Sequence, residues 1–259
     1  MKVIILTSNE TGTASRCIPV LAASDKIEIV SVVLSNGAQS HKKFDRLKKK
    51  LKKALKIGPL GALNGIRIRN WFRGKPTKNI ESICSELNLP LHRVNGINND
   101  ETEALFKAAN ADLGLSLGNS YIASHIFSVP HLGMINVHSE KLPAYQNAQS
   151  ILWNIYNMDE TTGLTIHQVD NKIDTGRIVY QEEYPIDFHA ALQETVETTV
   201  DITCNKVPAA VLHVCENYDA LIKDAKPQGS GDTYTTPSIF SFMKMIFNNR
   251  RLLKKQRRT

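Results

Sequence analysis

Short apolar runs alternate with amphipathic stretches along the first two thirds of the chain. Residues 3–6 and 27–34 are mostly apolar and β-branched, which predicts two buried strands. Residues 14–23 between them predict a helix, although Pro19 is expected to kink or shorten it. A strand, a helix and a strand of these lengths form a βαβ unit, and such units build parallel sheets.

The same alternation continues as far as residue 185. Its segments predict helices at 79–87, 101–109 and 148–157, and strands at 91–94, 111–117, 133–138, 163–169 and 177–185. Together they predict an α/β fold with a mostly parallel sheet flanked by helices. Open parallel sheets bind ligands at the carboxyl ends of their strands, so the strand ending at Leu117 predicts one wall of a site.

The pattern becomes mainly helical after residue 187. Residues 190–217 read as one long helical stretch, in which Pro208 marks a kink or a junction between two helices. We therefore expect a main domain over residues 1–187 and a small helical C-terminal extension over residues 188–259.

Positive charge is concentrated in two segments, although the formal net charge of the whole chain is only +7. Residues 41–78 hold 14 Lys and Arg against one Asp, with leucines at helical spacing until Gly58–Gly61 breaks the pattern. Residues 240–259 hold 7 Lys and Arg and no acid. Few stacking aromatics accompany these charges, which disfavours nucleic acid as a partner. A solvated helix face or peripheral contact with an anionic membrane would explain both segments.

Composition limits the remaining possibilities. The chain is 42% hydrophobic, which is enough for a sizeable core, and no run approaches the roughly 20 apolar residues of a membrane span. The apolar run at the N-terminus is too short for a signal peptide, so we expect a cytoplasmic protein. Four widely spaced cysteines predict core thiols, with neither disulfides nor a metal site.

Three polar residues suggest a catalytic centre. Asn136 and His138 lie two positions apart at the end of a predicted strand, so their side chains point to the same side. An amide and an imidazole placed together can stabilise an oxyanion and move protons. Asp174 follows the next predicted strand and could orient and charge the imidazole. Alone, the pattern also fits a capped loop around a hydrogen-bonded histidine.

Three sequence blocks resemble those of the folate-dependent formyltransferases. Residues 134–145 (MINVHSEKLPAY) resemble the N-x-H-x-S-x-L-P loop of that family. Residues 162–170 (TGLTIHQVD) and 172–178 (KIDTGRI) resemble its T-G-x-T-x-H and D-T-G blocks, in the same order and at similar spacing. The resemblance covers most of residues 1–217, with the basic segment 41–78 as an insertion.

This resemblance implies a fold, a co-substrate and a set of site residues. The fold would be Rossmann-like, residues 1–187 would be the catalytic domain, and the formyl donor would be N10-formyltetrahydrofolate. Asn136, His138 and Asp174 match the catalytic positions of the family. The pterin ring of the donor would be held largely by backbone groups near five residues, namely Ser116, Leu117, Gly118, Ile122 and Asp170.

The chain departs from the family in the loop beside these positions. Ser139 and Glu140 replace the usual proline and serine, and Gln146-Asn147 replaces the usual Arg-Gly, which leaves the acceptor contacts less defined than the chemistry. His167 matches a family position, and a packing or loop-fixing role is at least as consistent with it as catalysis.

Three amine acceptors are known within the family. Methionyl-tRNA formyltransferases carry a C-terminal β-barrel, whereas the 72 residues after Asp187 read as mainly helical. Glycinamide ribonucleotide formyltransferases have a glycine-rich phosphate loop, whereas residues 7–13 hold one glycine and an acid. The resemblance therefore favours the enzymes that formylate nucleotide-linked amino sugars for O-antigen or other surface polysaccharides, which are often homodimers. A non-catalytic folate- or nucleotide-binding protein is the alternative from another class.

Overall fold

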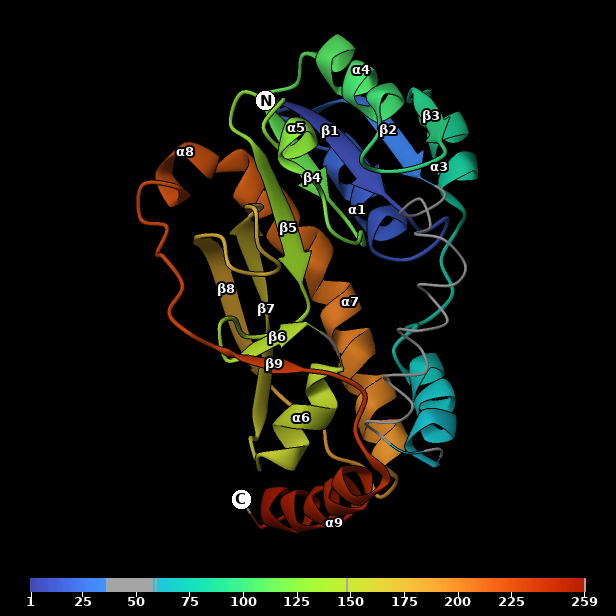
Figure 1. Cartoon of the computed structure of the whole chain (residues 1–259), viewed down its shortest axis with the longest axis vertical. Coiled ribbons are helices and arrows are strands. Elements are labelled where there is room, and N and C mark those ends of the chain that lie inside the picture. The colour runs from blue at the N-terminus through green and yellow to red at the C-terminus, as the bar shows by residue number, and fades with distance from the viewer. Residues whose placement is uncertain (36–57, 59, 148, 259) are drawn as a thin grey trace.

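A seven-stranded sheet forms the centre of the molecule (Figure 1). The computed structural model describes residues 1–35, 58, 60–147 and 149–258. The strands are β1 (Lys2–Thr7), β2 (Glu28–Ser35), β3 (Leu91–Val94), β4 (Leu113–Ser116), β5 (Met134–His138), β7 (Thr161–Gln168) and β8 (Ile178–Pro185). Their order is β3-β2-β1-β4-β5-β7-β8. The first five are mutually parallel, β7 runs antiparallel to β5, and β8 runs antiparallel to β7, so the predicted mostly parallel sheet is confirmed.

Helices cover both faces of this sheet. The helices are α1 (Thr13–Ala22), α3 (Ile80–Glu86), α4 (Asp100–Ala109), α5 (Ser124–Phe127), α6 (Ser150–Tyr156), α7 (Leu192–Glu216), α8 (Tyr218–Leu221) and α9 (Ile239–Gln256). On β1, Val3 and Ile5 pack with α1, α3 and α7, whereas Ile4 and Leu6 pack with α4 and α5. Because both faces are covered, β1 requires the uninterrupted apolar run seen in the sequence.

Two prolines lie inside helices without ending them. Pro19 lies in α1 and Pro208 in α7, and each removes one backbone hydrogen bond. Burial of the surrounding positions offsets that loss, since Val207, Val211 and Val214 all belong to the main core. The two-helix alternative at Pro208 is therefore wrong, because α7 is one helix of 25 residues.

A small parallel sheet, which the sequence pattern did not predict, joins the middle of the chain to its C-terminal part. Strand β6 (Tyr145–Asn147) pairs with β9 (Asp232–Tyr234) across almost 90 residues of sequence. The Tyr234 ring stacks between Tyr145 and Trp153, with centroids 5.3 and 4.9 Å away. A Cβ at Gly231 would lie 1.7 Å from the Pro143 carbonyl oxygen, so only glycine permits this crossing.

The segments on either side of residue 187 share one core. Helix α7 packs along α1, and its buried side chains join those of β1, β4 and β7. Helix α9 packs on α6 and completes a second core cluster around Trp71, Phe242 and Met245. The division of the chain into domains 1–187 and 188–259 stays a prediction.

Most of the basic insertion, including its predicted leucine-spaced helix, lies outside the described residues. Residues 58 and 60–71 are helical, so the predicted break at Gly58–Gly61 is wrong at the three of its residues that the structure describes. This helix packs against α9 through Trp71 and Phe242, whose ring centroids are 5.9 Å apart. Among the helices that the structure describes, none is both long and apolar enough to cross a membrane.

Candidate active site

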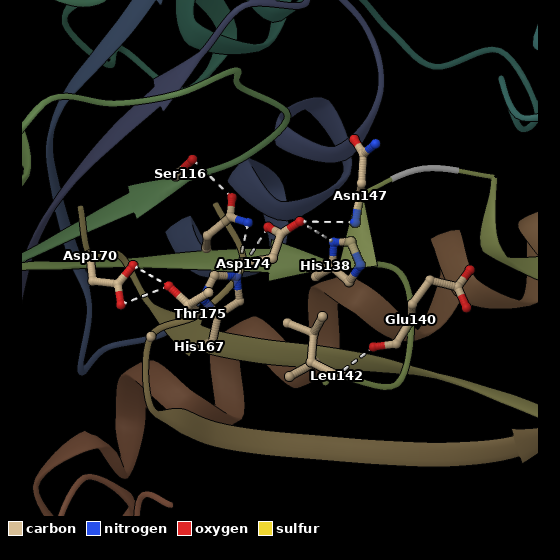
Figure 2. A network of polar contacts seen from close by, with 12 residues as sticks. Ser116, His138, Glu140, Leu142, Asn147, His167, Asp170, Asp174 and Thr175 are labelled. Atoms are coloured by element: carbon tan, nitrogen blue, oxygen red, sulfur yellow. Dashed lines mark hydrogen bonds and ion pairs between the residues drawn. The ribbon is translucent and has the colours of Figure 1, made fainter. Parts of the chain in front are cut away.

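The three predicted catalytic residues line one cavity at the carboxyl end of β5. Figure 2 shows His138 and Asp174 side by side there. Asn136 and His138 lie on β5, and antiparallel pairing with β7 places His167 directly opposite Asn136. The loop between β7 and β8 brings Asp174 to them. The Asp174 carboxylate lies 3.7 Å from His138 Nδ1 and 3.7 Å from His167 Nε2. The structure therefore adds His167 to the three residues that the sequence singled out.

A directed chain of hydrogen bonds fixes the Asn136 amide. Asn119 Nδ2 donates to Ser116 Oγ at 3.2 Å, and Ser116 Oγ donates to Asn136 Oδ1 at 3.0 Å. Asn136 Nδ2 lies 3.2 Å from His167 Nε2, and His167 Nδ1 donates to the Gln168 carbonyl oxygen at 2.8 Å. This leaves the lone pair of Nε2 to accept from Asn136. The amide orientation and the histidine tautomer thus determine each other.

A neutral His167 matches this arrangement. Burial lowers the pKa of the His167 imidazole, and the hydrogen bond to Gln168 and the nearby Asp174 carboxylate oppose that shift only in part. The neutral ring keeps the acceptor lone pair that Asn136 needs. One of the two N–H bonds of the Asn136 amide points at His167, and the other can donate to a negatively charged oxygen.

His138 has the opposite arrangement of ring nitrogens. Its Nε2 lies 2.9 Å from the Tyr145 carbonyl oxygen, which can only accept, so Nε2 carries the proton. Nδ1 is then the basic nitrogen, and it faces Asp174. The Asp174 carboxylate also accepts from the Asn147 backbone N–H at 3.2 Å. The hydrogen bond from Nε2 to Tyr145 thus orients the His138 ring, and Nδ1 is free to accept a proton.

The turn that carries Asp174 has an unusual backbone. Asp174 has a φ of +55°, which non-glycine residues rarely adopt and which occurs preferentially at functional sites. A Cβ at Gly176 would lie 1.8 Å from the Gln168 carbonyl oxygen, so the turn packs against the end of β7. Asp170 accepts from Thr175 Oγ1 at 2.8 Å and from the Lys172 backbone at 3.0 Å. These contacts explain why the block contains aspartate, threonine and glycine.

A first cavity of about 360 Å³ opens beside this turn. Asn136, His138 and Asp174 line it, together with segments 118–122 and 169–174. Of the five residues predicted to hold the pterin, four line this cavity, namely Ser116, Gly118, Ile122 and Asp170. Leu117 does not, because its side chain is buried in the main core and its N–H donates to the Leu6 carbonyl oxygen at 3.0 Å.

A second cavity of about 730 Å³ lies on the other side of His138. The two cavities share Val137, His138 and Asn147. Five separate stretches line the second cavity: residues 9–13 leading into α1, residues 72–77, residues 137–140 at the end of β5, the stretch around the start of α6, and one face of α7. No local pattern in the sequence predicts this space, because no single segment contributes most of it.

The family of the chain follows from its sequence as a whole. The formyl transferase family matches residues 1–211. The chain belongs to the formyl transferase family. The methionyl-tRNA formyltransferase of Bacteroides thetaiotaomicron is 29% identical over 157 residues, which is 59% of this chain and 46% of the relative. That of Chlorobium chlorochromatii is 31% identical over 107 residues, or 41% of this chain and 34% of the relative. The matched part spans less than half of these two curated relatives.

Solved structures of this family share the fold. A sugar N-formyltransferase from Shewanella sp. has a TM-score of 0.56 at 15% identity, covering 96% of this chain and 87% of its own. A phosphoribosylglycinamide formyltransferase from Anaplasma phagocytophilum has a TM-score of 0.56 at 14% identity, covering 90% and 99%. An N-formyltransferase from Helicobacter canadensis, solved with folinic acid and dTDP-3-aminofucose, has a TM-score of 0.54 at 13% identity, covering 96% and 79%.

One departure of this formyl transferase from the family blocks has a structural consequence. Glu140 replaces a serine, and its carboxylate is buried at 3% exposure on the edge of the second cavity. Burial raises the pKa of Glu140 well above its usual range, although a hydrogen bond from Thr162 opposes the shift. A buried carboxyl group two positions after His138 changes the polarity of that cavity wall.

Within residues 1–35, 58, 60–147 and 149–258, no group of three or more His, Cys, Asp and Glu side chains could hold a metal ion. The expectation of metal-free chemistry stays a prediction. Cys17, Cys84 and Cys215 are buried and unpaired, and Cys204, also unpaired, lines the second cavity.

Proposed function

We propose that the protein transfers a formyl group from N10-formyltetrahydrofolate to the amine of a nucleotide-linked amino sugar. The observation that carries the proposal is the pair of cavities that meet at His138. A transferase must hold donor and acceptor with their reacting atoms a few ångströms apart, and a shared wall allows this. Asn136 and Asp174 line the first cavity beside His138 and complete the catalytic set.

The first cavity is suited to the donor. Ile122, Val169 and Ile173 provide apolar surface. We expect main-chain groups of the lining segments 118–122 and 169–174 to supply the hydrogen bonds at its edge. A pterin is a flat ring with amine and amide edges, so such a site can hold it through backbone contacts. When bound, the donor supplies an activated formyl group. Gly118, Ile122 and Asp170 are the residues that we assign to it, and Leu117 could contribute only its main chain.

Each catalytic side chain then has one task. The free N–H of Asn136 stabilises the negative charge that grows on the formyl oxygen as the amine attacks, a contribution worth about two to three powers of ten in rate. His138 accepts the amine proton at Nδ1 and returns it to N10 of the donor as the bond between the formyl carbon and N10 breaks and tetrahydrofolate leaves. Asp174, 3.7 Å away, stabilises the resulting imidazolium. His167 and Ser116 touch no reacting atom and act by positioning the amide.

The second cavity is suited to an acceptor that carries phosphate. Arg73 and Lys75 line it, although Lys75 also lies 3.6 Å from Asp201. The N-terminus of α1 reaches the same space, and its first turn has neither an acidic residue nor a side-chain cap. Helix N-termini of this kind bind anions through free backbone N–H groups. Gln149 Oε1 is buried at this cavity without a hydrogen-bond partner among the described residues and could accept from a sugar hydroxyl.

The extent of the fold similarity supports a sugar acceptor further. The sugar N-formyltransferase structures cover 96% of this chain, whereas two phosphoribosylglycinamide formyltransferase structures cover 82% and 90%. Methionyl-tRNA is the second candidate acceptor, because the curated relatives with about 30% identity formylate it by name. Glycinamide ribonucleotide is the third, and a non-catalytic ligand-binding protein is the alternative from another class. We further propose a cytoplasmic homodimer that contributes to surface polysaccharides.

A substrate panel separates these acceptors. The purified protein is incubated with N10-formyltetrahydrofolate and, in parallel, dTDP- and GDP-linked 3- and 4-amino sugars, glycinamide ribonucleotide and methionyl-tRNA. Mass spectrometry then detects the gain of one formyl group. We expect transfer to an amino sugar nucleotide. Transfer only to methionyl-tRNA or to glycinamide ribonucleotide would replace the sugar proposal, and tetrahydrofolate release with no acceptor formylated would refute transfer altogether.

A further inference from the structure

Exposed apolar side chains are concentrated on two helices. Ten large hydrophobic side chains among the described residues are exposed, and six of them lie on the helix at residues 60–71 and on α9. Each of the six is 61–81% exposed. They are Leu60, Leu63 and Ile66 on the first helix, and Phe240, Met243 and Phe247 on α9. Scattered exposed hydrophobics need no explanation, whereas a gathered set indicates an interaction surface.

The two helices lie together at one end of the molecule. In Figure 1 the helix at residues 60–71, drawn in cyan, stands beside the start of α9, drawn in red, at the end opposite α4 and β3. A Cβ at Gly65 would lie 2.7 Å from the Thr236 methyl carbon, so the chain leading into α9 packs closely on this helix. The six apolar side chains therefore belong to one region, which we call the helical end face.

Internal packing does not account for the exposed stripe of α9. Phe242, Met245 and Leu252 fill the second core cluster from the inner side of the helix. Phe240, Met243 and Phe247 recur at three- and four-residue spacing on the outer side. A helix that needs only one apolar face to fold thus presents a second one to solvent.

Every charged side chain of α9 is positive. The outer stripe continues from Phe247 into Arg250, Arg251 and Lys254, and the chain has no acidic residue after Asp232. The Arg251 guanidinium lies 5.8 Å from the centre of the Phe247 ring. Arg67 and Arg69 add positive charge on the neighbouring helix. An apolar stripe flanked by long basic side chains is typical of helices that lie in the interface of an anionic bilayer.

A second copy of the chain fits this surface less well. A symmetric contact would bring the same arginines and lysines of the two copies together, and like charges that lose water repel each other. A bilayer with anionic headgroups offers both an apolar layer and the opposite charge. We propose that the helical end face docks on an anionic membrane surface, with Phe240, Met243 and Phe247 inserted below the headgroups.

Docking would place the acceptor cavity near the lipid. Residues 72–77 follow the helix at 60–71 directly and line the second cavity. The docking surface and the cavity wall are therefore parts of one continuous segment. The docking proposal does not depend on the identity of the acceptor, because it rests on side chains outside both cavities.

Vesicle sedimentation tests the apolar part of the proposal. The full chain is mixed with phosphatidylcholine vesicles with or without phosphatidylglycerol, and we expect binding to the anionic vesicles. The variant Phe240→Ser/Met243→Ser/Phe247→Ser should bind more than about tenfold more weakly, since each ring or thioether loses its burial. Leu87→Ser/Leu132→Ser, which changes exposed apolar side chains elsewhere, should bind like the wild type. Circular dichroism confirms that each variant is folded.

A charge series tests the electrostatic part. Arg250→Gln/Arg251→Gln/Lys254→Gln should weaken binding about a hundredfold, because each basic side chain near the surface contributes several-fold. Lys2→Gln/Lys26→Gln/Lys223→Gln removes the same charge away from the helical end face and should leave binding unchanged. Absence of binding at low salt, or equal binding by the two charge variants, overturns the proposal. The proposal is also overturned if the wild-type chain forms a dimer, the serine variant is monomeric, and neither protein binds vesicles. That result would assign the surface to a second copy of the chain.

Discussion

The two cavities on either side of His138 are built in different ways. The first takes its walls largely from the ends of β4, β5 and β7 and from the loops that follow β4 and β7, and a chain of hydrogen bonds through Ser116, Asn136 and His167 fixes its polar groups. The second is assembled from five stretches that range from residue 9 to residue 204. Chemistry that needs fixed geometry is thus encoded in short local blocks, whereas recognition of the second ligand depends on the tertiary arrangement.

The largest effect should come from removing the amide donor in the first cavity. Asn136→Ala removes the N–H bonds that we assign to the formyl oxygen, so kcat should fall about 10²- to 10³-fold. Asn136→Asp should be as slow, since a carboxylate cannot donate. Steady-state kinetics with saturating donor and acceptor measure this. A loss confined to KM would mean that Asn136 binds substrate without stabilising the transition state.

Removing the hydrogen bond to the Asn136 amide oxygen should lower kcat less than removing the amide itself. Ser116→Ala removes the hydroxyl that donates to Asn136 Oδ1, leaving the amide free to rotate, and kcat should fall about tenfold. Ser116→Thr keeps a hydroxyl and should recover part of the rate. Ser120→Ala, also on the cavity wall, is the matched control. If the alanine and threonine variants were equally slow, packing rather than the hydrogen bond would be responsible.

A substitution in the second cavity should change the KM for the acceptor. Arg73→Gln removes a cationic group that we assign to the acceptor phosphate, so the acceptor KM should rise about tenfold while the donor KM stays constant. Arg69→Gln, on the neighbouring helix and outside the cavity, should change neither. A parallel rise in both KM values would contradict the division of labour between the cavities.

The smallest effect concerns stability and its dependence on pH. Burial raises the pKa of Glu140, so the folded state holds the carboxyl proton more tightly than the unfolded chain does. This group therefore destabilises the folded state as the pH rises above the pKa of the unfolded chain, which is about 4.3. Glu140→Gln should remove that loss and raise the free energy of unfolding at pH 7. Urea denaturation should show this more stable variant at pH 7, and the difference should vanish near pH 3. A variant less stable at pH 7 would contradict this.

Much of the first cavity was predictable from sequence. The alternation of side chains on β5 predicted that Asn136 and His138 share a side, and the D-T-G turn predicted Asp174 nearby. The bridging role of His167 was not predicted, because it depends on the register in which β5 and β7 pair. The contribution of Leu117 stays a prediction that concerns its main chain alone, since one residue of alternation turns its side chain from the cavity into the core.

The second cavity and the small sheet could not be predicted in this way. Strands β6 and β9 have three residues each, too few for a period to show, and stacking of Tyr145, Trp153 and Tyr234 holds them. Arg73 and Gln149 meet the start of α1 only through the packing of the chain. Such contacts have no signature at fixed sequence spacing.

The central claim is that formyl transfer occurs where the two cavities meet at His138, and a single-turnover measurement tests it most directly. Wild type and His138→Asn are saturated with N10-formyltetrahydrofolate and the acceptor found in the panel, then quenched at successive times. The account predicts that the variant binds both substrates and forms the formylated amine about 10³-fold more slowly or not at all, whereas exposed His92→Asn is unaffected. Transfer by His138→Asn at the wild-type rate would contradict it.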